Sequence, residues 1–227
     1  MQQLNNTVNF EPGTARALSY GWERMKANAL LFFLVALVAV VVELPNKGNS
    51  QEFEGDSITA IWSLLYFAYT LLFAPVINYG VDLIFLQGVR GDRVVINRLF
   101  DGFNNYVNVI LANLLVFGLV IIGIVVFIVP GIYIGCRLAF TSYLVMDEGM
   151  DPVAAVEASW RLTKGHAWKI FLLGLLSILI FIAGLLLLVI GVLPAIMWIK
   201  SSFAAMYLSI SQSIPPAQLE DNAEETL

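Results

Sequence analysis

The sequence predicts an all-α, polytopic membrane protein with six transmembrane helices arranged as three hairpins. Three observations predict this class. Of the 227 residues, 59% are hydrophobic and 13% are charged. The mean hydropathy of +0.81 lies outside the range of soluble domains. Long uncharged runs separate Lys26 from Glu43, Asp56 from Asp82, Asp101 from Arg137, and Lys169 from Lys200, and a spanning helix needs only about 20 apolar residues.

Turn residues divide these runs into six expected spans. Between the third and the fourth, the turn at Val129 to Gly131 leaves no room for a soluble loop. The spans are expected near 28–44, 58–79, 106–129, 131–147, 168–192 and 194–211. Residues 1–27 should form a cytoplasmic segment with an interfacial helix, and 28–211 the membrane domain. The acidic tail at 212–227 should be solvated and disordered.

Lys and Arg residues in the short loops predict the orientation, because they are retained on the cytoplasmic side. Nine lie on one side of the expected spans, whereas only Lys47 lies on the other. Both termini are therefore expected in the cytoplasm. The nine are Arg16, Arg24, Lys26, Arg90, Arg93, Arg98, Arg161, Lys164 and Lys169.

Amphipathic aromatic side chains should mark the two membrane interfaces. Trp22, Trp160 and Trp168 are expected as anchors at the inner edge, whereas Tyr133 and Trp198 are expected near an outer end. Each outward span also follows an amphipathic segment with an aromatic residue: "SYGWERMKANALLFFL", "LFDGFNNYVNVILANL" and "EASWRLTKGHAWKIFL". This weak repeat indicates either three tandem hairpins with interfacial helices or features common to any membrane hairpin.

The most charged stretch, "DEGMDPVAAVEASWRLTKGHAWKIF", predicts an amphipathic helix in the headgroup layer. Asp151 is a favourable N-cap and Pro152 occupies the favoured first helical position. The cations of this stretch are candidates for binding anionic lipid. Alternatively, they only set the topology. These candidates are Arg161, Lys164 and Lys169.

Ionisable residues inside a span are functional candidates, because charge is expensive in hydrocarbon. Arg137 and Lys200 could form an anion site between the fourth and sixth helices, and no acid is expected at their depth. Alternatively, they snorkel to the outer headgroups or pair with Glu43. Asp82 should pack against the basic cytoplasmic segments, because a proton relay would need further acids or histidines in the membrane.

Catalytic motifs are absent from the sequence, which predicts a protein that is not an enzyme and holds neither a metal nor a cofactor. His166, the single histidine, should make local hydrogen bonds, and Cys136 should pack as a small residue. No basic block favours nucleic acid. Small residues in "GIYIG" and at Ser201, Ala205 and Ser209 should seat helices within the monomer.

Four segments carry a resemblance to a known family. They are "GWERMKAN", "APVINYGVDLIFLQGVRGDRVVINRLFDGF", "IVPGIYIGCRLAFTSYLVMDEGMDPVAAVEASWRLTKGHAWKIF" and "VLPAIMWIKSSFAAMYLSI". From about Leu18 to Ser209 the chain resembles the YciC-like group of six-helix bacterial membrane proteins, which is related to the membrane domain of some glycerophosphoryl diester phosphodiesterases. The resemblance implies a bacterial cytoplasmic-membrane protein. It implies no activity, because no activity is established for the family, and the phosphodiesterase relatives carry their catalysis in a separate soluble barrel.

These observations favour a non-enzymatic protein that binds membrane phospholipids, a membrane protein partner or a second copy of itself. It would act as a scaffold, an accessory subunit or an envelope-homeostasis factor. The alternative is a small permease or lipid-handling transporter that uses Arg137 and Lys200 to attract an anionic group.

Overall fold

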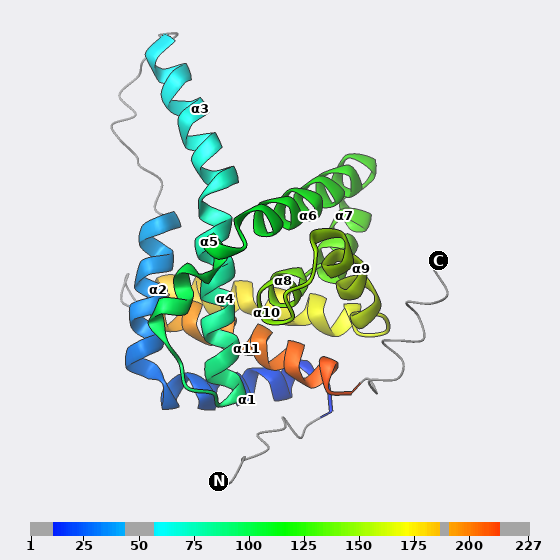
Figure 1. Cartoon of the computed structure of the whole chain (residues 1–227). Coiled ribbons are helices and arrows are strands. Elements are labelled where there is room, and N and C mark those ends of the chain that lie inside the picture. Colours follow the sequence, from blue (N-terminus) through cyan, green and yellow to red (C-terminus); the bar gives the residue numbers. More distant parts are fainter. Residues whose placement is uncertain (1–10, 44–56, 187–190, 214–227) are drawn as a thin grey trace.

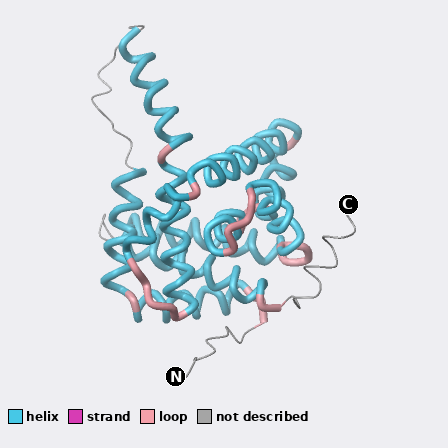
Figure 2. Tube along the Cα trace, in the orientation of Figure 1, coloured by secondary structure: helices cyan, strands magenta, loops and turns pink. Residues whose placement is uncertain are grey.

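The computed structural model describes residues 11–43, 57–186 and 191–213, and every regular element in these ranges is a helix (Figure 1). Short loops join the helices throughout this part of the chain (Figure 2). The elements are α1 (Thr14–Ala27), α2 (Ala29–Glu43), α3 (Ser57–Leu72), α4 (Ala74–Arg90), the 3-10 helix η1 (Ile96–Phe100), α5 (Asp101–Asn104), α6 (Tyr106–Val126), α7 (Ile128–Arg137), α8 (Thr141–Asp147), α9 (Pro152–Leu162), α10 (Ala167–Leu186) and α11 (Val192–Ser211). The all-α class is confirmed.

Five segments of the described chain are long and apolar enough to cross a membrane. They are Ser63–Arg90, Tyr106–Val126, Ile128–Asp147, Ala167–Leu186 and Val192–Ser211. The pair α1 and α2, which bends by 102°, would make a sixth. The described chain therefore has five or six helices suited by length and composition to cross a membrane, as a multi-pass membrane protein requires. The side chain of Glu43, a predicted partner of Lys200, lies outside the part of the chain that the structure describes. The same holds for the acidic tail from residue 214.

The second predicted span, 58–79, ends too early. Its helix is interrupted only at Phe73, and α4 then continues to Arg90, where Gly91 at φ 90° forms a left-handed C-cap. Asp82 therefore lies two turns inside the candidate span rather than near its end. The sequence prediction ended the span before this carboxylate, because the local sequence does not reveal the residue on a distant helix that neutralises it.

Helix α1 packs antiparallel along α11 (Figure 1). A Cβ atom on Gly21 would lie 2.7 Å from Ser202 Oγ and 2.8 Å from its backbone, so only glycine permits this approach. Trp198 Nε1 donates a hydrogen bond to the Leu18 carbonyl at 2.9 Å. The Trp22 and Trp198 rings lie 4.8 Å apart. The prediction that these two rings mark opposite edges of the membrane is wrong, because small residues let α1 lie against the body of α11.

Substituting Gly21 by Ala should destabilise the fold by about 1–3 kcal/mol, since the added methyl must displace the Ser202 backbone. The matched control is Gly118→Ala on α6, where a Cβ meets nothing within 4 Å. The control should leave the unfolding midpoint of the detergent-solubilised protein unchanged or raise it, because Ala favours a helix over Gly. Equal midpoints for the two variants would contradict the close α1–α11 contact.

The other two basic segments of the predicted repeat also pack on helices, in each case on the helix that precedes them in the chain. The segment η1–α5 lies against α4, where a Cβ on Gly80 would come within 2.1 Å of the Leu99 carbonyl oxygen. Helix α9 lies against α6 and α8, with Ala155 and Ser159 fully buried. The amphipathic segments are therefore held by protein contacts along one face. Their placement in the headgroup layer stays a prediction.

Small residues seat helices within the monomer, as predicted. Ser201, Ala205 and Ser209 on α11 are buried at 0%, 0% and 2% exposure. Gly131 faces α6, where an added Cβ would lie 2.3 Å from Ile124. By contrast, α3 projects from the rest of the described chain (Figure 1), and its side chains from Ser63 to Phe67 are exposed.

Candidate functional site

The ion pair between Lys200 and Asp82 joins α11 to α4 inside two candidate spans. Lys200 Nζ donates to Asp82 Oδ1 at 2.7 Å, and Ser142 Oγ on α8 donates to Asp82 Oδ2 at 2.9 Å. The Asp82 and Lys200 side chains are 14% and 31% exposed. The expectation that no acid lies near Lys200 is wrong, and Asp82 contacts Lys200 and Ser142 rather than the basic cytoplasmic segments.

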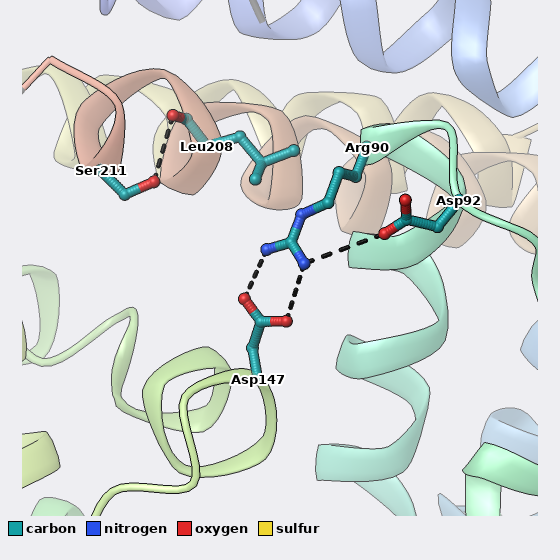
Figure 3. A network of polar contacts seen from close by, with 5 residues as sticks. All are labelled: Arg90, Asp92, Asp147, Leu208 and Ser211. Carbon is teal, nitrogen blue, oxygen red and sulfur yellow. Dashed lines mark hydrogen bonds and ion pairs between the residues drawn. The ribbon is translucent and has the colours of Figure 1, made fainter. Parts of the chain in front are cut away.

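A second ion pair lies where α4 and α8 end. Arg90 Nη1 donates to Asp147 Oδ1 at 2.9 Å, and Nη2 donates to Oδ2, so the guanidinium binds the carboxylate through both nitrogens (Figure 3). Asp92 lies 3.9 Å from the same guanidinium. Two parallel bonds make this the most directional kind of ion pair. It holds the C-terminal ends of α4 and α8 together.

Replacing Arg90 by Lys should destabilise the protein by about 1 kcal/mol, because Lys keeps the charge but cannot form the planar two-bond contact. Both partners are partly buried, with side-chain exposures of 31% and 12%. The matched control, Asp92→Asn, removes a partner that is 51% exposed and 3.9 Å away, so its effect should be near zero. Chemical unfolding in detergent micelles measures both changes. A larger effect from Asp92 than from Arg90 would contradict this assignment.

Arg137 connects the end of α7 to the end of α9. Its Nη2 donates to the Trp160 carbonyl, one of the terminal carbonyls of α9. In return, the Arg137 carbonyl at the end of α7 accepts a hydrogen bond from Ser159 Oγ at 3.0 Å and lies 2.9 Å from Thr163 Oγ1. Ser159 Oγ also accepts from the Phe140 amide at 3.3 Å. A side chain at each helix end therefore donates a hydrogen bond to a terminal backbone carbonyl of the other helix.

Aromatic rings cover the Arg137 side chain, which is 5% exposed. The guanidinium carbon lies 4.5 Å from the centre of the Trp160 ring and 5.9 Å from that of Tyr133. These two rings meet edge to face at 6.1 Å, so the prediction that Tyr133 and Trp160 lie at opposite edges of the membrane is wrong. Arg137 Nε is buried without a hydrogen-bond partner among the described residues.

The predicted surface cations divide into two groups. Arg161 and Lys164 are exposed beside the turn at Gly165, next to Trp168, which is 74% exposed. Lys169 is held by the N-terminal segment instead, because its Nζ donates to the Pro12 carbonyl at 2.9 Å. His166 lies in the turn, with Nδ1 3.2 Å from the Lys164 carbonyl. The structure thus leaves Arg161, Lys164 and Trp168 exposed around one turn and places Arg137 and Lys200 in separate internal contacts.

Sequence reasoning missed three sets of contacts, namely the pair of Arg90 with Asp147, the bond of Ser142 to Asp82, and the hydroxyls of Ser159 and Thr163 at the Arg137 carbonyl. One signal could have indicated where the charges belong. The second span of each expected hairpin contains a proline, then a charged residue six or seven positions later, then a phenylalanine three positions after that. The three segments are "PVINYGVDLIF", "PGIYIGCRLAF" and "PAIMWIKSSF". The charged residues of this pattern are Asp82, Arg137 and Lys200.

The apolar helices and internal ion pairs of the described residues are those of an all-helical, multi-pass membrane protein. Comparison with known proteins adds no narrower class, since no family model, no curated protein and no solved structure matches this chain.

Proposed function

We propose that this protein is a non-enzymatic scaffold or accessory subunit, or an envelope-homeostasis factor, that binds anionic membrane lipid at the turn between α9 and α10. The observation that carries the proposal is the exposed set Arg161, Lys164 and Trp168 at that turn. Two cations and an indole at one surface suit an anionic headgroup and the interface below it. A membrane protein partner or a second copy of the chain would compete for the same surface.

Internal pairing supports a structural rather than a transporting role. Lys200 is bound to Asp82, and Arg137 is bound to the Trp160 carbonyl beneath two rings. A carrier for anions would keep such cations accessible to its substrate. The earlier assignment of these two cations to an anion site remains a prediction, and it would require each to exchange a protein contact for the anion.

The proposed organisation is six spans in three hairpins, with both termini in the cytoplasm of a bacterial cell and the spans in its cytoplasmic membrane. Two observations support it. The pattern of proline, charge and phenylalanine occurs once in each expected hairpin. Each basic segment packs on the second span of a different hairpin, since α1 contacts α11, η1 contacts α4 and α9 contacts α8. The segment before the first hairpin thus contacts the third hairpin, the one before the second contacts the first, and the one before the third contacts the second.

The lipid proposal is tested with purified full-length protein in nanodiscs of phosphatidylethanolamine with a minority of phosphatidylglycerol. Native mass spectrometry should show retained phosphatidylglycerol, and Arg161→Gln with Lys164→Gln should lower its affinity on the order of 30-fold, since each surface cation contributes about 1 kcal/mol. The matched control removes two charges elsewhere, at the exposed Arg16 and Lys26 of α1. Equal losses from the two double variants would refute a site at this turn.

A small permease or lipid-handling transporter is the second candidate, favoured by the interruption at Phe73 within the span Ser63–Arg90. Transport proteins often break a helix at the membrane midplane. Protein-dependent solute uptake or lipid scrambling in liposomes would favour this candidate over the scaffold. Intact lipid co-purification and intact transport after charge removal at Arg137 and Lys200 would count against their use in it.

A further inference from the structure

A pocket of about 420 Å³ lies between α3, α4 and α6. Tyr66, Phe67 and Tyr69 of α3, Asn78 of α4, and Asn113 and Phe117 of α6 contribute to its lining. The α3 and α4 portions belong to the candidate span Ser63–Arg90, and the α6 portion belongs to Tyr106–Val126. The pocket therefore lies between two candidate spans, and no residue of the turn between α9 and α10 lines it.

The interruption of the helix creates this pocket. Pro75 has no N–H group, so it cannot donate to the Leu71 carbonyl four residues earlier. The Val76 amide donates to the Phe73 carbonyl at 3.1 Å instead. The helix is interrupted, and residues on both sides of Phe73, including Leu71 and Pro75, line the opening.

The two asparagines make the pocket more than a gap for lipid tails. Asn78 and Asn113 are half-buried, and neither side chain has a hydrogen-bond partner among the described residues. Each amide offers two N–H donors and one carbonyl acceptor. An unsatisfied amide in hydrocarbon costs several kcal/mol, so a group in this opening that accepts hydrogen bonds from both amides would be stabilised there.

The remaining lining determines the chemical class of that group. None of the described residues that line the pocket carries a charge, so a phosphate or carboxylate would be desolvated without compensation. Aromatic rings line it on α3 and α6. Thr70, Tyr66, Tyr69 and Tyr79 add neutral hydroxyls to the two amides. Neutral polar groups among apolar and aromatic side chains, in a pocket of this size, are typical of a small-molecule site.

We propose that this pocket binds the uncharged, carbonyl-bearing part of a membrane-soluble molecule, with Asn78 and Asn113 donating to its carbonyl oxygens. Two sources have this chemistry, namely the ester region of a glycerolipid and the ring of a quinone. The site is independent of the surface cations at Arg161 and Lys164, so either proposal can fail without the other.

The test uses the full-length protein in nanodiscs with a diacylglycerol that carries a diazirine beside its ester. Photolysis followed by peptide mapping should place adducts in 66–79 and 113–117. Asn78→Leu and Asn113→Leu should each reduce this labelling about tenfold, which corresponds to about 1.4 kcal/mol. The matched control is Asn108→Leu, which lies on α6 outside this pocket and should label as the native protein does.

Competition identifies the source. If decylubiquinone displaces half of the label at a lower concentration than unlabelled diacylglycerol does, the site is assigned to a quinone; the reverse order assigns a glycerolipid ester. Labelling spread evenly over all spans would show annular lipid only and overturn the proposal. Native labelling in the Asn78→Leu, Asn113→Leu double variant would also overturn it. Leucine is well tolerated in membrane helices, and the unfolding midpoint of each variant verifies that it folds.

Discussion

Replacing Asp82 by Leu should lower the free energy of unfolding by on the order of 2–3 kcal/mol. The substitution leaves Lys200 inside a span without its carboxylate and Ser142 without its acceptor. Breaking a fully buried ion pair costs about 3–5 kcal/mol. We expect a smaller value because the Lys200 side chain is 31% exposed. Denaturant titration in mixed micelles measures the change.

The decisive comparison is the double variant Asp82→Leu, Lys200→Leu. Replacing both members of a buried pair by apolar residues is often neutral or stabilising, so the double variant should recover most of the loss of the single one. Lys200→Leu alone should also destabilise the protein, because it leaves Asp82 uncompensated. Additive losses in the double variant would show that the two residues do not interact in the membrane.

Replacing Arg137 by Lys should destabilise the protein by about 2 kcal/mol, although the charge is retained. Lysine cannot lie flat on the Trp160 and Tyr133 rings, and its single ammonium group is a poorer match for the planar contact. The loss of the cap on the Trp160 carbonyl should loosen the end of α9. Hydrogen exchange of the α9 amides measures this local effect separately from global unfolding.

Two further variants sharpen the Arg137 experiment. Ser159→Ala removes the hydroxyl that bridges the Phe140 amide and the Arg137 carbonyl, so it should give the same loss of α9 protection at about 1–2 kcal/mol. Arg161→Lys, on the exposed face of the same helix, should leave protection unchanged. If Arg137→Lys kept native protection, its positive charge alone would be what matters, which is the behaviour of an anion site.

The fold class could be predicted from the sequence, because it depends on the length of uncharged runs along the chain. The expected span at 106–129 appears as α6, and the one at 194–211 as α11, each within a few residues. The error at 58–79 arose at Asp82, where a single charge was treated as the end of a helix. A charge ends a membrane helix only when nothing neutralises it, and Lys200 lies 118 positions away in the sequence.

The candidate site could be predicted only as a set of residues. Arg137 and Lys200 were identified because charge is rare inside spans. Their partners were not, because a backbone carbonyl and a single aspartate carry no distinctive pattern. The same holds for Asn78 and Asn113, whose proximity across one pocket depends on how α6 lies against the broken helix.

The sequence by itself determined that this protein is helical, that it crosses a membrane several times and which of its residues are charged within the spans. Those properties are local, since they follow from the transfer of consecutive side chains from water to hydrocarbon. Only the tertiary structure decided that α1 lies on α11, that aromatic rings predicted at opposite membrane edges contact each other, and that Asp82 neutralises Lys200. Those contacts depend on which helix faces pack together, and packing depends on shape complementarity between distant segments.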